Sequence, residues 1–388
     1  MNPDTPATRV GYTVLQLMAY FLRLGTLDFG GPVALVGYMH RDLVERRGWI
    51  NEADYKEGLA LAQIAPGPLA AQLAIYLGYV HYRILGATAA GFAFVLPSFL
   101  MVVGLGWAYQ SFGGLAWMQS VFYDVGASVI GIMVISAHKL ATKNIDRDTL
   151  LWAIFALLAG VTIATQSEIA LLFIACGVLV WLVRCKPRIG PNHTASAWPI
   201  GLLGLTLAGD GSLLTQLALF FTKAGAFVFG SGLAIVPFLY GGIVTEHHWL
   251  NDKQFVDAVA VAMITPGPVV ITTGFIGYLI GGLPGACVAA AATFLPCYLI
   301  TLLAAPHFKK YGKRPALIAF VDGITAAAVG AIAGSVVVLA TRAVTDIPTG
   351  LLAIGTTALL WRYKKLPEPV VVLSAALIGL LVYPLVHR

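Results

Sequence analysis

Two proline–glycine–proline triplets lie 200 residues apart in strongly apolar sequence: residues 64–70 read IAPGPLA and residues 264–270 read ITPGPVV. Proline interrupts a helix but favours the first turn of a new one, so each triplet predicts a helix break followed by a helix start. The first N–H groups of a helix lack intrahelical partners and lie at the positive end of its dipole. Two such starts that face each other would hold a small anion. The predicted contacts are Pro66, Gly67, Pro68 and Leu69 in the first triplet and Pro266, Gly267, Pro268 and Val269 in the second.

A pair of basic residues points to the same chemistry. Arg23 and Lys223 are also 200 residues apart, inside the apolar runs MAYFLRLGTLDFGG and LALFFTKAGAFVFGSG. Charges within a membrane are costly and usually functional. Seven residues further on, each run reaches a flexible break, Gly30-Gly31-Pro32 or Gly230-Ser231-Gly232, where the backbone could approach a ligand closely. Cations beside four breaks suit a small oxyanion.

Each of these features has a structural alternative. A single triplet could be a packing kink, and a cation near a helix end could snorkel to the headgroups. The symmetric recurrence favours a binding role. The roles of the acidic residues stay open. Asp28 has no counterpart in the second copy and could pair with Arg23. Asp124 and Asp322 align with each other and could be helix-start charges or proton carriers. Glu57 and Asp257 align near predicted helix starts.

Patterns for other chemistry are missing from the sequence. The eight histidines form no HxxxH or HExxH spacing, and no Walker loop or Ser-His-Asp arrangement is apparent. The four cysteines form no CxxC pair and are expected to be small apolar residues; they are Cys176, Cys185, Cys287 and Cys297. We therefore expect no metal, no cofactor and no enzymatic activity.

The composition places these motifs in a membrane. Of 388 residues, 59% are hydrophobic and 11% are charged, with a mean hydropathy of +0.84, whereas soluble domains carry about 25% charged residues. We expect an all-α polytopic protein of the lipid bilayer. The net charge of +6 arises from short basic clusters between apolar runs, which indicate membrane topology and not nucleic-acid binding.

The chain contains two copies of one unit. At an offset of 200 residues, glycine, tryptophan and asparagine positions coincide as well as the two triplets, among them Gly25 with Gly225, Trp49 with Trp249 and Asn51 with Asn251. Asn51 and Asn251 are predicted N-caps. We predict a first repeat over residues 1–188, a linker over 189–208 and a second repeat over 209–388. Duplication with broken helices is typical of transporters.

Basic residues fall in alternate loops of the two copies. The first copy has them at Arg83, at 139–147 and at 184–188, whereas the second has them at 309–314 and 362–365. Because Lys and Arg mark the cytoplasmic side, the copies are predicted to have opposite orientations. We expect about five crossings in each copy, with a re-entrant or broken-helix segment. The ordinary spans are placed at 84–108, 115–138, 149–165 and 168–183, and at 284–305, 315–341, 347–362 and 369–386. Of the two interrupted stretches of the first copy, 12–39 and 57–80, we expect one to cross and the other to return.

The order of these motifs resembles the chromate ion transporter family, in its long-chain, two-domain type. The segment DFGGPVALVGYMHRDLVERRGWI followed by LAQIAPGPLAAQLAIYLGY carries the resemblance, which extends over essentially the whole chain. The second copy departs from it, with VFGSGLAIVPF in place of the FGGP stretch. The resemblance implies efflux of chromate from the cytoplasm, with sulfate as a chemically similar anion. It also implies functional roles for Phe29, Gly30, Gly31 and Pro32 and for Pro66, Gly67 and Pro68.

The residues alone lead to an inverted-repeat anion transporter. The mechanism that we expect for it is alternating access. We expect it to be driven by membrane potential or by proton/anion exchange, in the bacterial inner membrane. A sulfate or other oxyanion exchanger and an anion channel would share these features, whereas a chromate reductase is disfavoured. The sequence leaves open the coupling ion, the preference between chromate and sulfate, and the oligomeric state, with a homodimer as one candidate.

Overall fold

The computed structural model consists of helices and their connections throughout the part of the chain that it describes. The described residues are 11–27, 31–112, 116–145, 147–165, 170–185, 212–226, 228, 235–308, 314–344, 346–363, 366 and 368–386. The first half contains α1 (Val14–Leu27), α2 (Gly31–Met39), the π-helix η1 (His40–Arg46), α3 (Glu52–Ile64), α4 (Leu69–Phe112), α5 (Ala116–Asn144), α6 (Thr149–Thr165) and α7 (Ala170–Cys185). The second half contains α8 (Leu213–Ala226), α9 (Ile235–Tyr240), the π-helix η4 (Gly241–Glu246), α10 (Asp252–Ile264), the 3₁₀-helix η5 (Val269–Ile271), α11 (Thr272–Ala304), α13 (Pro315–Ala343), α14 (Ile347–Arg362) and α15 (Glu368–Val386).

The second half repeats the succession of elements in the first, including the π-helix. The predicted caps are confirmed: the Asn51 side chain accepts a hydrogen bond from the Asp54 N–H, and Asn251 and Gln254 form a reciprocal capping box. Among the described residues, four helical segments are long and apolar enough to cross a membrane, and they lie within α4, α5, α11 and α13. The ordinary spans expected from the sequence coincide with helices in both halves.

The triplet of the first half stands at the tip of a helical hairpin. A Cβ atom on Gly58 of α3 would lie 2.3 Å from the ring of Tyr76 in α4, so the chain folds back on itself around Pro66-Gly67-Pro68. Helix α4 is itself two helices joined by a sharp turn at Arg83, whose φ is +53°. Gly78 packs against the Gly86 backbone across this turn. The α11 helix has the same construction, with its turn at Gly281 and Gly282.

The stretch that contains α1 and α2 also returns to where it began. Tyr12, just before α1, stacks on Trp49, which follows η1, with ring centroids 4.7 Å apart. The Tyr12 hydroxyl lies 2.7 Å from Nδ1 of His81, next to the Arg83 turn. Both interrupted stretches of the first half therefore have their two ends on the same side. This differs from the expectation that one of them runs straight through, because a break at Gly and Pro permits a reversal as readily as a kink.

The later part of α4 and the later part of α11 run in opposite directions. Gln110, near the end of α4, donates a hydrogen bond to the Leu279 carbonyl beside the α11 turn, and Thr88, near the α4 turn, bonds to Tyr298 near the end of α11. We call the side that holds Arg83, Lys139, Arg147 and Arg184 the basic end, and the side that holds Phe112 and Gly282 the far end.

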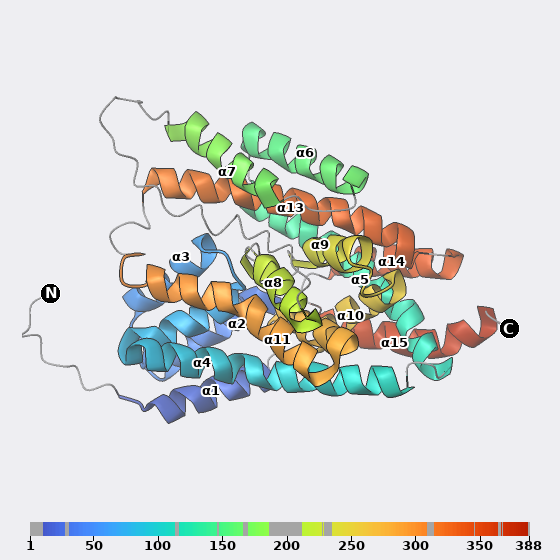
Figure 1. The fold of residues 1–388 in the computed structure, drawn as a ribbon, viewed down its shortest axis with the longest axis horizontal. Coiled ribbons are helices and arrows are strands. Elements are labelled where there is room, and N and C mark those ends of the chain that lie inside the picture. Colours follow the sequence, from blue (N-terminus) through green and yellow to red (C-terminus); the bar gives the residue numbers. More distant parts are fainter. Residues whose placement is uncertain are drawn as a thin grey trace, which may run out of the picture.

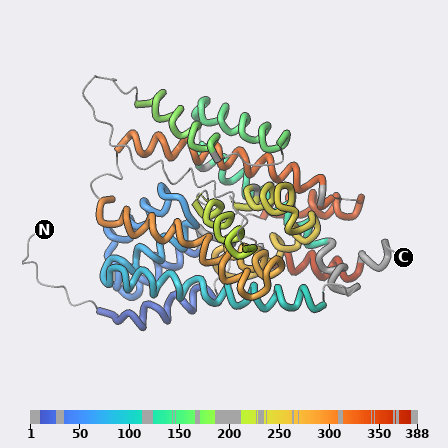
Figure 2. Tube along the Cα trace, viewed as in Figure 1, coloured from blue at the N-terminus to red at the C-terminus, as the bar shows by residue number. Residues whose placement is uncertain are grey.

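The two halves interleave along the long axis of the molecule. Helices α6 and α7 of the first half pack on α13 of the second, and α14 and α15 of the second half pack on α5 of the first (Figures 1 and 2). Small residues allow these close crossings: Gly330 of α13 lies against the Phe155 backbone of α6, and Gly131 of α5 lies against α14. The exchange is reciprocal, so neither half is packed as a separate body.

An ion-pair network fastens α6 and α7 to α13 at the basic end. Arg184, in the last turn of α7, donates to Asp148 at 2.6 Å and to Asp322 of α13 at 2.5 Å. Asp148 also accepts hydrogen bonds from the Leu150 and Leu151 N–H groups at the start of α6. The hydrogen bond from Arg184 is the main reason that the pKa of Asp148 lies below its usual value.

The network predicts a pH-dependent contribution to stability. A lowered folded-state pKa stabilises the protein above the unfolded pKa of about 4, and this stabilisation is lost as the pH falls below that value. Arg184→Gln is expected to lower the melting temperature at pH 7 by about 1–2 °C, for a loss of about 1 kcal/mol in a partly exposed network. Melting curves between pH 3 and 7 measure both effects. Lys139→Gln, an exposed cation outside the network, is the control; an equal shift in both variants would contradict the assignment.

Candidate functional site

The tips of both triplet hairpins meet the opposite half of the chain. The Gly67 N–H donates to the carbonyl of Val228 at 2.5 Å, and Val228 lies two residues before Gly230 of the second flexible break. A Cβ atom on Gly67 would also lie 2.8 Å from Cβ of Cys297 in α11. In the other half, Gly267 lies against Ser98 of α4, whose hydroxyl faces the Gly25 carbonyl of α1 at 3.3 Å. Each triplet thus contacts residues of the other half, and we call these two contact regions together the central junction.

Both triplet glycines have backbone conformations that other residues rarely adopt. The φ of Gly67 is +143° and that of Gly267 is +95°. The new helix begins directly afterwards, since the Gln72 N–H bonds to the Pro68 carbonyl and the Ile271 N–H bonds to the Pro268 carbonyl. The helix starts predicted at the triplets are therefore present.

Gln72 is a buried amide at the first of these helix starts. Its side chain is 1% exposed, and its Nε2 donates to the Pro66 carbonyl at 2.7 Å. Its Oε1 has no hydrogen-bond partner among the described residues. Buried acceptors in folded proteins are nearly always satisfied. The central junction thus holds a polar atom with unused hydrogen-bonding capacity.

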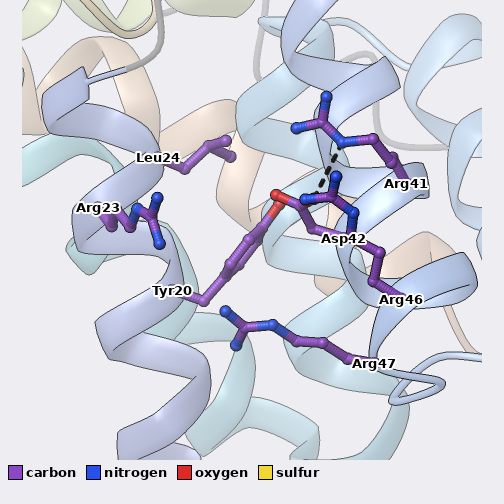
Figure 3. A pocket seen from close by; sticks show the side chains of 7 residues that line it. All are labelled: Tyr20, Arg23, Leu24, Arg41, Asp42, Arg46 and Arg47. Carbon is purple, nitrogen blue, oxygen red and sulfur yellow. Dashed lines mark hydrogen bonds and ion pairs between the residues drawn. The ribbon is translucent and has the colours of Figure 1, made fainter.

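A second polar region lies nearer the basic end, between α1 and η1. A cavity of about 300 Å³ is lined by Tyr20, Arg23, Leu24, Arg41, Asp42, Arg46 and Arg47 (Figure 3). We call it the arginine pocket. The Asp42 carboxylate accepts a hydrogen bond from Nε of Arg41 at 3.1 Å and lies 3.6 Å from Arg46. The Arg47 guanidinium lies over the rings of Trp49 and Tyr20, at 4.5 and 5.2 Å from their centroids.

Comparison with known proteins identifies the family. The model of the chromate transporter family matches residues 15–181 and again residues 215–380. The chain belongs to the chromate transporter family. It is 69% identical to the chromate transport protein of Cupriavidus metallidurans, over all of this chain and 98% of the relative. It is 59% identical to a probable chromate transport protein of Synechococcus elongatus, over 95% and 96%, and 32% identical to the chromate transport protein of Pseudomonas aeruginosa, over 95% and 92%. No solved structure matches the chain.

For this member of the chromate transporter family, the structure gives a position to every predicted site residue that lies within the described part of the chain. Pro66 to Leu69 and Pro266 to Val269 lie at the central junction, while Gly31 and Pro32 begin α2. Phe29, Gly30 and Gly230 lie outside the described residues. One detail of the prediction needs correction: the Gly67 N–H is not free for an anion, because the Val228 carbonyl takes it.

The two members of the predicted basic pair differ in their surroundings. Arg23 lines the arginine pocket, and Lys223, which is exposed in the last turn of α8, is not among the lining residues. Sequence reasoning paired the two cations because it followed the repeat. The structure places Arg23 in one pocket lining with Arg41, Arg46 and Arg47 of its own half. Joint binding of an anion by Arg23 and Lys223 stays a prediction.

Two groups were not singled out from the sequence. The first group consists of three arginines within seven residues, a concentration of positive charge that the sequence displays. They are Arg41, Arg46 and Arg47. The second group contains Asp257, which the sequence places near a helix start. It is 3% exposed and accepts a hydrogen bond from the Tyr109 hydroxyl at 2.7 Å. No local pattern predicts that contact, because Tyr109 lies at the end of α4 in the other half.

Proposed function

We propose that this chromate transporter family member exports chromate from the cytoplasm by alternating access between two inverted halves. The observation that carries the proposal is the central junction, where each triplet contacts the inner helices of the opposite half. Interrupted helices leave backbone groups that are tolerated in a membrane only where they face protein, water or a ligand. A site built from both halves can open to either side when the halves move against each other.

Opposite orientation of residues 1–188 and 209–388, joined by a linker over 189–208, is part of the proposal. The antiparallel course of α4 and α11 supports it, as does the charge distribution. Arg314, at the start of α13, follows the end of α11 at the basic end, and the ring of Trp361 beside Arg362 contacts His138 near the end of α5. Because basic residues of both halves gather there, the basic end is assigned to the cytoplasm.

The two halves also differ in conformation, as alternating access requires. In the second half, α10 packs against α5, α13 and α15. In the first half its counterpart α3 packs against α4, α11 and η1, and within the described residues it has no comparable contact with α13, the counterpart of α5. Two inverted copies in different conformations can exchange them, which exposes the junction to the other side.

The energetics favour export of a dianion. Moving one negative charge out of a cell that is negative inside is favourable by about 2.3 kcal/mol per 100 mV, and a dianion gains twice that. We propose that membrane potential drives the transport in a bacterial inner membrane, and that sulfate competes at the same sites because it has the same shape and charge as chromate.

Uptake into inside-out vesicles tests the function. Chromate is expected to accumulate in vesicles that contain the protein when an inside-positive potential is imposed, and sulfate is expected to inhibit this accumulation. Control vesicles lack the protein. Equal accumulation with and without the protein would refute chromate transport. Accumulation of sulfate without that of chromate would point to the exchanger alternative.

Cysteine labelling tests the inverted orientation. Ser111 lies in the last turn of α4, His307 follows the equivalent helix α11, and both residues are exposed. In a background without Cys185 and Cys287, Ser111→Cys is expected to react with an impermeant maleimide only from outside, and His307→Cys only from the cytoplasm. Arg147→Cys is the cytoplasmic control. Reaction of both test residues from one side would contradict the inversion.

A further inference from the structure

We propose that the arginine pocket is a capture site that binds a free tetrahedral oxyanion at the basic end, before the anion reaches the central junction. The inference rests on the proposed transport function and adds a second anion site to it. Its ligand class is the dianion that chromate and sulfate share. The pocket lies between α1 and η1, which belong to the first half only.

The charge of the lining is the first argument. Four guanidinium groups and one carboxylate face the cavity. Asp42 lies within ion-pairing distance of Arg41 and Arg46, so the lining as a whole keeps an excess of positive charge. A guanidinium presents several N–H donors in a plane, which suits the oxygens of a tetrahedral anion. A cavity of about 300 Å³ is at the lower limit for a small-molecule pocket.

Arg47 is held in place before any ligand binds. The Arg47 guanidinium lies over the rings of Trp49 and Tyr20, and Trp49 itself stacks on Tyr12. Arg23 approaches from α1, across the pocket from Arg46 and Arg47 (Figure 3). The π-helix has a wider turn than an α-helix, and such turns are frequent at functional sites. A preordered set of donors loses less entropy on binding.

The second half of the chain serves as an internal control. Its π-helix η4 has the same backbone bonds: the Trp49 N–H reaches the Leu43 carbonyl at 2.8 Å, and the Trp249 N–H reaches the Ile243 carbonyl at 2.8 Å. The positions of Arg41, Arg46 and Arg47 are occupied there by Gly241, Glu246 and His247. The same local fold therefore forms without the basic residues. The local fold therefore does not depend on these arginines, and the second half has no arginine at the equivalent positions.

Binding of sulfate to the purified, delipidated protein tests the site. Arg46→Gln and Arg47→Gln are each expected to weaken sulfate binding by about tenfold, as loss of a charged hydrogen bond does. Arg46→Glu, which introduces the residue of the second half, is expected to weaken it further. Lys56→Gln removes an exposed charge of the nearby helix α3, outside the pocket, and is expected to change the affinity by less than about twofold. Unchanged affinity in the arginine variants would overturn the proposal.

Two further measurements separate the alternatives. The arginine variants are expected to lose sulfate affinity both in nanodiscs that contain phosphatidylglycerol and in nanodiscs that lack it. If the variants instead lose lipid binding and keep their sulfate affinity, the pocket binds a lipid headgroup and the proposal is overturned. Gly67→Ala, at the central junction, is expected to stop transport and keep arginine-dependent sulfate binding. If the wild type binds sulfate through these arginines and transports no chromate, the proposed function fails and the capture site stands.

Discussion

Gly67→Ala and Gly267→Ala are each expected to reduce chromate transport by more than about tenfold while the protein remains folded in the membrane. Both glycines have a positive φ, which costs an alanine about 1–2 kcal/mol. The added Cβ atom would lie 2.7 Å from the Gln72 amide and 2.8 Å from Cys297 in the first variant, and 2.0 Å from Oγ of Ser98 in the second. Such overpacking typically costs a further 1–3 kcal/mol.

The control for these variants is Gly104→Ala, because a Cβ atom there would meet nothing within 4 Å, although Gly104 belongs to the same helix α4 as Ser98. Transport is measured in vesicles and divided by the amount of folded protein from size-exclusion chromatography. Normal transport per folded molecule in both variants would show that the triplets are packing kinks, the alternative that a single triplet could not exclude.

The recurrence of special residues made the breaks predictable. Gly and Pro restrict the backbone locally, so PGP and the Asn caps could be placed from the sequence, and both are present in the structure. The direction of the chain after each break could not be predicted in this way. Whether Pro66-Gly67-Pro68 continues or reverses a helix depends on the contact between Gly58 and Tyr76, which only the folded chain shows.

The arrangement around the candidate site depended on contacts between distant segments. The Gly67 N–H meets Val228, and Tyr109 meets Asp257, in each case across the two halves. The periodicity of apolar residues does not predict which helices of the two halves pack against each other. Arg23 is a further example. The repeat relates Arg23 to Lys223, whereas in the structure Arg23 lines a pocket together with other arginines of its own half. Repeats predict what is shared between copies, and the arginine pocket is a feature that they do not share.

Tyr109→Phe is expected to destabilise the protein by about 1–3 kcal/mol, because it removes a donor from the buried Asp257 carboxyl group. Asp257→Asn is expected to destabilise it less, since the amide oxygen can still accept the hydrogen bond from Tyr109. Thermal unfolding of the purified variants measures the difference. The Tyr109 ring also packs edge-on against Phe275, a contact that phenylalanine retains, so the loss reports the hydroxyl group and not the packing.

Substitution of Asp257 tests how transport is driven. If membrane potential alone drives chromate export, Asp257→Asn transports chromate at close to the wild-type rate per folded molecule under an imposed potential, because no proton needs to bind at residue 257. If export is coupled to proton exchange through this buried carboxyl group, the amide variant loses transport while it still binds chromate. Glu57→Gln, at the equivalent position of the first half, is the matched control. It removes a titratable group from α3, which packs against α4, α11 and η1. We expect both amide variants to transport, and loss of transport in Asp257→Asn alone would replace the potential-driven mechanism with proton exchange at this residue.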